Sequence, residues 1–300
     1  MTVKKTLIIT IKVTGIITIN ENYFKGDFML GAVIGDIIGS VYEWHNVKSL
    51  EFELFSRESR FTDDTVMTVA VADALLNKEE TKNPFIDAYR RKRQYAYKFK
   101  EYGRKYPDAG YGNMFKVWLQ NNELVSQKSY GNGSAMRVSP IGFAFDKLED
   151  ALKEAKFSTS FTHNHKDAIK GAQSVVSAVY LSRHGERKEK IKAYIEKKFG
   201  YDLNLRIDEI RPTYKFDSSC RVSVPQAIIA FLESESYEDA IRKAISIGGD
   251  SDTIACITGG IAQAFYGKIP KYVIDNTNMR LDMGLKRIMN LFNSKYNIEI

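Results

Sequence analysis

Two short acidic segments, each placed directly before a strongly apolar helical stretch, constrain this chain more than any other feature. Residues 248–253 read Gly-Gly-Asp-Ser-Asp-Thr, and residues 61–65 read Phe-Thr-Asp-Asp-Thr. The amides at a helix N-terminus favour a nearby carboxylate, but adjacent carboxylates repel each other, and a cation offsets that repulsion best. Since the two clusters are of the same kind, we expect the fold to join both helix starts in one shared metal site.

Helical periodicity dominates the chain from Leu30 onward. Pro225 is expected at the start of its helix, where proline is favoured, and Gly267 as the C-cap of another. Residues 200–224 are the least regular part, and strand patterns are scarce after residue 28. The sequence therefore predicts an all-α fold, a single compact multi-helix domain with its site made from helix ends and loops. The expected later helices are residues 64–76, 84–105, 114–119, 147–157, 166–183, 187–198, 225–232, 237–245, 253–265 and 278–293.

Residues 1–28 differ from the rest of the chain. Residues 7–19 are apolar and β-branched, but this run is too short to span a membrane and Lys12 interrupts it. No small-residue cleavage site follows, which argues against a signal peptide. We expect an N-terminal extension over 1–28, either a peripheral strand or disordered, and not part of the functional protein if the true start is Met29. Residues 29–300 then form the functional domain.

Gly31, Gly35 and Gly39 recur every four residues and so lie on one face of the first helix. In a membrane this spacing is typical of a helix-dimer seam, but Asp36 breaks the apolar run. In a soluble protein it indicates that another backbone packs very close to this face. Glu43 follows at the end of the segment, and we expect it to point into the space that this packing encloses.

Composition limits the partners of the chain. Of 300 residues, 44% are hydrophobic and 27% charged, within the range of ordinary soluble proteins. The two cysteines, Cys220 and Cys256, are too few for a disulfide framework and predict reduced core residues in a cytoplasmic protein. The net charge of +7 arises largely in residues 90–105 and 187–198. Solvated helix faces explain these stretches better than nucleic-acid binding does, so we expect no nucleic-acid partner, no membrane contact and a monomer.

The acidic clusters supply only oxygen ligands, which favour Mg²⁺, Mn²⁺ or Ca²⁺ over Zn²⁺. Their carboxylates exceed what one ion needs, whereas two ions about 3.5–4 Å apart would use them well. Each cluster alone has a second explanation, which is N-capping by Thr62 or Ser251 with acids in the first helical turn. Two such clusters together favour the metal site.

A glycine-bearing loop at residues 129–137 is the second candidate element. Its glycines let backbone amides approach an anion, Tyr130 could stack on an aromatic base, and Asn132 can bond ribose hydroxyls. A plain turn is the alternative, and for residues 110–112 we favour it. His163 suits a substrate contact better than a metal ligand, and His165 suits a cap or surface position. Arg137 is expected to pair with an internal acid, such as Asp36.

Five motifs in order resemble the ADP-ribosylglycohydrolase family, which includes the dinitrogenase-reductase-activating glycohydrolase and the ADP-ribosyl-acceptor hydrolases. They are Gly35-Asp36-x-x-Gly39 with Tyr42-Glu43, Phe61 to Thr65, Gly131 to Arg137, Thr162-His163, and Gly248 to Thr253. The resemblance implies a compact all-α fold and a centre of two Mg²⁺ or Mn²⁺ ions. It implies metal ligands at Thr62, Asp63, Asp64, Asp250, Asp252 and Thr253. It implies an ADP-ribose site along Ser129, Tyr130, Gly131, Asn132 and Gly133, with His163 as a further contact, and it matches Glu43 to a glutamate on a mobile segment.

The resulting hypothesis is a metal-dependent hydrolase that cleaves the bond between ADP-ribose and an acceptor in a protein or small molecule. A metal-activated water attacks the anomeric carbon, and Glu43, Asp63 or Asp64 carries the proton. One alternative is a metal-dependent phosphohydrolase of a nucleotide sugar, and another is a non-catalytic ADP-ribose-binding protein. The sequence leaves the acceptor open, and residues 44–60 and 100–130 are expected to form the outer wall that selects it.

Overall fold

The glycines of the first helix bring two buried helices into backbone contact in the computed structural model, which describes residues 29–78 and 83–298. A Cβ on Gly35 would lie 2.0 Å from the carbonyl oxygen of Ala255, and one on Gly39 would lie 2.4 Å from the Cα of Asp252. Helices α1 (Gly31–Gly39) and α12 (Ser251–Tyr266) therefore run antiparallel in close contact. The expectation of a close backbone neighbour is confirmed, and the contact places the end of α1 beside the acidic start of α12.

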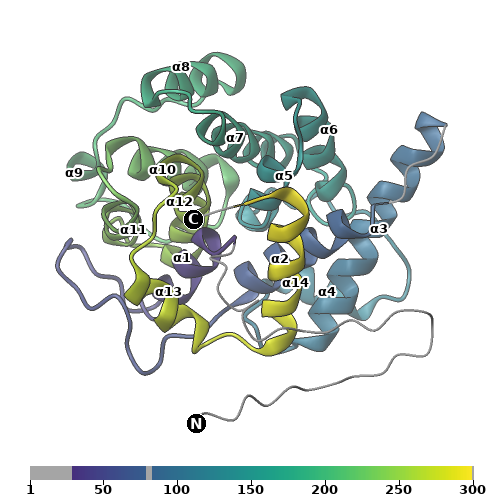
Figure 1. Ribbon diagram of the computed structural model, residues 1–300, viewed down its shortest axis with the longest axis horizontal. Coiled ribbons are helices and arrows are strands. Elements are labelled where there is room, and N and C mark those ends of the chain that lie inside the picture. The colour runs from purple at the N-terminus through teal and green to yellow at the C-terminus, as the bar shows by residue number, and fades with distance from the viewer. Residues whose placement is uncertain (1–28, 79–82, 299–300) are drawn as a thin grey trace, which may run out of the picture.

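The described residues contain fourteen α-helices, one short 3-10 turn and no strand (Figure 1). Two isolated bridges, between residues 128 and 163 and between residues 131 and 219, are the only β-type pairs within these ranges. The predicted all-α class, in one compact domain, is confirmed. The remaining elements are α2 (Asp63–Leu76), α3 (Pro84–Lys105), α4 (Asn113–Gln120), η2 (Asn132–Ser134), α5 (Ser139–Ala144), α6 (Leu148–Thr159), α7 (Lys166–Arg183), α8 (Lys188–Phe199), α9 (Ile207–Ile210), α10 (Cys220–Glu233), α11 (Tyr237–Ser246), α13 (Lys271–Asn278) and α14 (Met283–Tyr296).

Helix α12 lies at the centre of the molecule. It contacts α1, α7, α10 and α11 on different sides, and it is buried from Ser251 to Gln263. A helix that is apolar all round requires such a position. Helix α2 packs against α1, α3 and α14, and Figure 1 shows α14 beside it. Because α2 and α12 both meet α1, their N-terminal ends open toward one region of the core.

Two predicted helices start elsewhere in the structure, and three further helices are not predicted. Helix α10 begins at Cys220, so Pro225 lies inside it and the expected start at residue 225 is wrong. The backbone N–H of Cys220 donates to the carbonyl of Tyr130 at 3.0 Å, which fixes the earlier start through a distant loop. Helix α14 begins at Met283 because Asp282 caps it, accepting from the N–H of Leu285 at 2.9 Å. Helices α5, α9 and α13 are not among the helices that the sequence predicts.

The expected extension over residues 1–28 lies outside the described residues. Within the described ranges, no helix is both long enough and apolar enough to cross a membrane.

Candidate functional site

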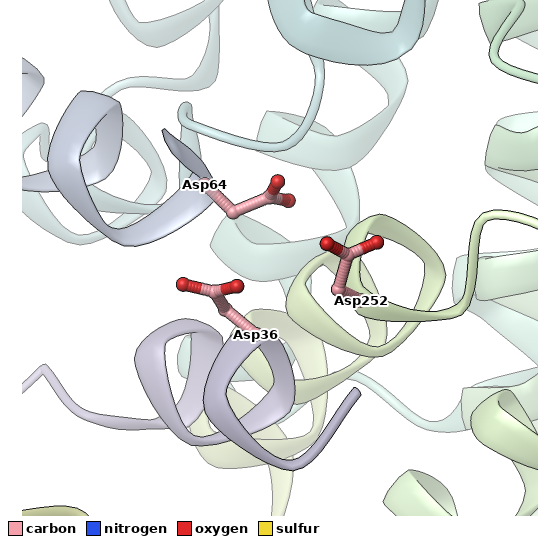
Figure 2. A group of neighbouring side chains, drawn as sticks. All are labelled: Asp36, Asp64 and Asp252. Atoms are coloured by element: carbon pink, nitrogen blue, oxygen red, sulfur yellow. The ribbon is translucent and has the colours of Figure 1, made fainter. Parts of the chain in front are cut away.

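Three carboxylates from three helices converge at the centre of the fold. Asp36 extends from α1, Asp64 from α2 and Asp252 from α12, and Figure 2 shows their side chains pointing toward a common space. One oxygen of each lies within 4.8 Å of the others, and all three residues are buried. The two acidic helix starts therefore meet, as their composition predicts. Asp36 joins them, a role that sequence reasoning missed.

Asp36 organises the start of α2. Its Oδ1 accepts from the Thr62 hydroxyl at 2.6 Å, and its Oδ2 accepts from the Thr62 amide at 2.9 Å. The same Oδ2 accepts from the Thr65 amide at 3.1 Å and from the Thr65 hydroxyl at 2.5 Å. Since the Thr62 hydroxyl donates its proton to Asp36, its oxygen keeps lone pairs for the amide of Asp64 and for a cation.

A second acidic group shares Asp252 with the first. Glu43, Asp250 and Asp252 each offer an oxygen within 4.8 Å of the others. Gly248 and Gly249 precede this group with positive φ angles of 74° and 71°, a left-handed backbone that favours glycine. The glycine pair therefore turns the chain sharply enough to bring Asp250 beside Asp252.

The other predicted ligands lie at the same place. The hydroxyl of Thr253 donates to Oδ2 of Asp64 at 3.2 Å, which links α12 to α2. Asp63 is partly buried and lines the cavity beside Asp64. The second oxygen of Asp64, Oδ1, is buried and has no hydrogen-bond partner among the described residues. A buried carboxylate oxygen without a partner is costly, and a cation would satisfy it.

The electrostatics of the cluster favour a cation as well. Burial raises the pKa of Asp36, Asp64, Asp250 and Asp252, and neighbouring carboxylates raise it further for Asp64 and Asp252. Burial, together with Asp36 and Asp250, raises the pKa of Asp63 to about 8. So many carboxylates share one space that they cannot all ionise at neutral pH unless positive charge is present. The residues therefore fit a group of hard divalent cations, which oxygen ligands prefer.

Glu43 stands at the rim of the cluster. It is half-buried, and burial followed by the charge of Asp250 raises its pKa to about 7. Trp44 follows it, and the Trp44 ring stacks on Phe216 with centroids 5.5 Å apart and an interplanar angle of 17°. A carboxyl group with a pKa close to neutral can both give and accept a proton under ordinary conditions.

The glycine loop at residues 129–137 contacts the cluster through Asn132. The side-chain amide of Asn132 donates to Oδ2 of Asp250 at 2.7 Å. The loop is held in place because the N–H of Asn132 donates to the carbonyl of Ser218 at 2.7 Å. The ring of Tyr130 is 60% exposed and makes an edge contact with His165, 5.8 Å between centroids. Tyr130 therefore has a face free for a ligand, whereas Asn132 serves the acidic cluster.

A cavity of about 760 Å³ joins these parts. Its wall contains all of the predicted site residues and also residues from both stretches expected to form the outer wall, including Trp44, Arg60 and Tyr111. The predicted site residues that line it are Glu43, Thr62, Asp63, Asp64, Ser129, Tyr130, Gly131, Asn132, Gly133, His163, Asp250, Asp252 and Thr253.

Arg137 does not pair with Asp36, contrary to the expectation. Its guanidinium is buried, donates to the carbonyl of Ser158 at 3.1 Å and to the hydroxyl of Thr162 at 2.7 Å, and lies 4.0 Å from the centre of the Phe99 ring. The donors of Thr62 and Thr65 satisfy the Asp36 carboxylate, and Arg137 bonds to Ser158 and Thr162 instead. The sequence alone does not show whether Arg137 pairs with Asp36 or with Ser158 and Thr162, because both pairings are between residues far apart in the chain.

The sequence of this chain is similar to a known protein family and to proteins of known name. Residues 25–297 match the sequence model of a family described as ADP-ribosylglycohydrolase. The chain is 29% identical to "ADP-ribosylhydrolase ARH3" of Mus musculus, over 81% of this chain and 84% of that protein. It is 29% identical to the protein of the same name of Homo sapiens, over 81% and 85%.

A bacterial relative and a solved structure extend the comparison. The chain is 26% identical to "ADP-ribosylarginine hydrolase Tri1" of Pseudomonas putida (strain GB-1), over 80% of this chain and 69% of that protein. A solved structure titled "ADP-ribosylglycohydrolase-related protein complex" shares the fold, with a TM-score of 0.63 at 21% identity over 91% of this chain and 96% of that one.

Proposed function

Because the chain belongs to the ADP-ribosylglycohydrolase family, we propose that it hydrolyses the glycosidic bond between ADP-ribose and an acceptor in a protein or small molecule. The observation that carries this proposal is the convergence of Asp36, Asp64 and Asp252. Of these, Asp64 and Asp252 line the cavity, with Glu43 at its rim. Relatives named as ADP-ribosylhydrolases support the substrate class.

We propose that two Mg²⁺ or Mn²⁺ ions bind at this cluster. Thr62, Asp63 and Asp64 from the start of α2, with Asp250, Asp252 and Thr253 from the start of α12, would hold them, and Asp36 would orient Thr62. Two observations support this assignment: Oδ1 of Asp64 has no hydrogen-bond partner within residues 29–78 and 83–298, and two acidic groups share Asp252. Such ions, when bound, neutralise the carboxylates and lower the pKa of water, which makes it a stronger nucleophile.

The side chains around the cluster have separable roles in the proposed reaction. Glu43 would carry the proton, because its pKa near 7 and its half-buried position suit exchange with water and substrate. Asp63 and Asp64 remain alternatives for that role. Asn132 would hold Asp250 in place through its amide. Tyr130 would stack on the adenine base, with Ser129, Gly131, Gly133 and His163 along the rest of ADP-ribose.

A product assay tests the proposal. The purified chain is incubated with a panel of ADP-ribosylated acceptors linked through arginine, serine, a nucleic-acid end or a small molecule, each with EDTA, Mg²⁺ or Mn²⁺. We expect free ADP-ribose and intact acceptor, only with a divalent ion. Release of AMP and ribose phosphate would instead indicate a phosphohydrolase of a nucleotide sugar. Binding of ADP-ribose without turnover of any acceptor would indicate a non-catalytic binding protein.

We also propose that residues 29–300 form the catalytic domain of a cytoplasmic monomer. The buried free thiols of Cys220 and Cys256 fit a reducing compartment. All proposed site residues lie within this range.

A further inference from the structure

A buried chain of hydrogen bonds runs from Arg137 to His163 in the wall of the cavity. The Nη2 of Arg137 lies 2.7 Å from the Thr162 hydroxyl oxygen, and Nδ1 of His163 lies 2.9 Å from that same oxygen. All three residues are more than nine-tenths buried. All three residues line the cavity, so this chain of hydrogen bonds borders the proposed ligand site.

The donors and acceptors in this chain can be assigned. A guanidinium only donates, so the Thr162 oxygen accepts from Arg137. The hydroxyl proton of Thr162 then needs an acceptor, and among the described residues the neighbour in place to receive it is Nδ1 of His163. If Nδ1 carried a proton instead, two donors would meet at the Thr162 oxygen and the hydroxyl proton would be left without a partner. The arrangement that satisfies every group puts the imidazole proton on Nε2.

The imidazole is also held in its neutral form. Burial, followed by the positive charge of Arg137, lowers the pKa of His163 well below its usual value. A neutral imidazole has one donor and one acceptor, and the hydrogen bond at one ring nitrogen decides the role of the other. With Nδ1 occupied as an acceptor, Nε2 is a permanent donor.

The Nε2 atom faces the glycine loop. A Cβ on Gly133 would lie 3.0 Å from Nε2, and one on Gly131 would lie 3.7 Å from it. The loop is therefore free of side chains at the two positions next to this nitrogen, which leaves space for a ligand atom. ADP-ribose carries oxygens that accept hydrogen bonds along its length.

We propose that Thr162 and Arg137 are positioning residues that fix His163 as the Nε2–H tautomer, so that the imidazole donates a hydrogen bond to an oxygen of ADP-ribose beside residues 131–133. This inference rests on the proposed function for its ligand, and on the protein's own contacts for the tautomer. Thr162 and Arg137 themselves do not touch the substrate in this assignment.

Paired substitutions of Thr162 test the proposal in the full chain. Thr162→Val has nearly the same shape but lacks the hydroxyl, whereas Thr162→Ser keeps it. The tautomer is measured from the ¹⁵N NMR shifts of the His163 ring, assigned by comparison with His163→Gln. We expect the Nε2–H pattern in the wild type and Thr162→Ser, and a mixed or Nδ1–H pattern in Thr162→Val.

Calorimetric titration with ADP-ribose gives the functional half of the test. We expect Thr162→Val to weaken ADP-ribose binding about tenfold and Thr162→Ser to stay within about twofold of the wild type, as for other residues that orient a ligand contact. An Nδ1–H pattern in the wild type overturns the proposal even if Thr162→Val fails to fold. Unchanged affinity in a folded Thr162→Val overturns it too. A wild type that binds no ADP-ribose refutes the proposed function and the ligand assignment together, while the NMR pattern still reports on the tautomer.

Discussion

The side-chain amide of Asn46 forms two hydrogen bonds with the backbone of Gly249, one as acceptor and one as donor. Asn46 Oδ1 accepts from the N–H of Gly249 at 2.7 Å, and Asn46 Nδ2 donates to the Gly249 carbonyl at 3.1 Å. The same Nδ2 donates to the carbonyls of Tyr42 and Glu43 at 2.7 and 2.8 Å. One amide thus joins the segment that carries Glu43 to the turn that presents Asp250, so it sets the distance between these two acids.

Replacing Asn46 should therefore lower turnover without unfolding the protein. Asn46 is an exposed residue outside the hydrophobic core, so Asn46→Ala should keep the fold. Loss of a residue that orients a catalytic group typically costs about 10–100-fold in activity. We expect a loss of this size in kcat for ADP-ribose release, measured at saturating Mg²⁺ or Mn²⁺.

Asn276→Ala provides a matched control for this prediction. The amide of Asn276 also donates to a backbone carbonyl, that of Tyr272 at 2.8 Å, but on α13 and away from the cavity. Its turnover should equal that of the wild type. A folded Asn46→Ala with more than half of the wild-type kcat would contradict the role given to Asn46.

Asp252 should link metal binding to stability, because it belongs to both acidic groups. Asp252→Asn removes a carboxylate whose pKa is raised well above its usual value by burial and then by Asp250. The metal-free variant should therefore unfold at a higher temperature than the metal-free wild type at pH 8. Bound Mg²⁺ should stabilise the wild type, by about 2.7 kcal/mol at a hundredfold excess over its Kd, and should not stabilise the variant.

Scanning calorimetry with EDTA and with Mg²⁺ measures both effects. Asp275→Asn is the control, since Asp275 is exposed and pairs with Lys271 at 2.6 Å. It should respond to Mg²⁺ as the wild type does.

Asp252→Ala should lose metal and activity together. Full metal-dependent turnover in Asp252→Ala would show that the site assignment is wrong.

The parts of this site that are predictable from the sequence are local patterns. The acids at residues 61–65 and 248–253 stand next to the helices they open, and the spacing of Gly31, Gly35 and Gly39 marks one helix face. Each pattern has a physical reason within a few residues of chain. A close backbone neighbour for the first helix, and a shared position of both acidic helix starts, follow from these patterns. The fold shows both and identifies the neighbour as α12.

The parts that sequence reasoning missed depend on distant contacts. Asn46 and Gly249 are 203 positions apart, and nothing near Asn46 indicates the bond. Asp36 reads as an acid that interrupts an apolar run, although in the fold four donors from Thr62 and Thr65 surround it. The sequence offers one indication, which is that Asp36 lies among the glycines of a helix expected to be buried. A buried acid needs hydrogen-bond partners, but the position of Asp36 does not identify them.

The stability of the metal-free protein should fall as the pH rises from about 4 to about 8. In the native state the pKa of Glu43 is raised to about 7 and that of Asp63 to about 8, from ordinary values of 4.5 and 3.8. At a pH between the ordinary and the raised pKa of each group, the native state still holds a proton that the unfolded chain has released. Each such proton lowers the free energy of unfolding by about 1.4 kcal/mol per pH unit.

Urea unfolding in EDTA at several pH values between 5 and 9 measures this slope. Saturating Mg²⁺ should reduce or reverse it, because metal binding requires deprotonated carboxylates. Glu43→Gln should make the metal-free slope shallower. A metal-free stability that rises with pH over the same range would mean that the carboxylates are not crowded as described.

Gly35→Ala should separate the two central helices. The added Cβ would lie 2.0 Å from the carbonyl oxygen of Ala255, where backbone and not a flexible side chain must move. Overpacking a core typically costs about 1–3 kcal/mol, and this contact lies one residue from Asp36, so the shift should also weaken Mg²⁺ binding. Gly112→Ala is the control for stability, since nothing lies within 4 Å of a Cβ there and its φ of −62° suits any residue. Urea unfolding and Mg²⁺ titration of both variants test the prediction. A Gly35→Ala protein as stable as Gly112→Ala would show that α1 and α12 do not depend on direct backbone contact to bring Asp36 to Asp252.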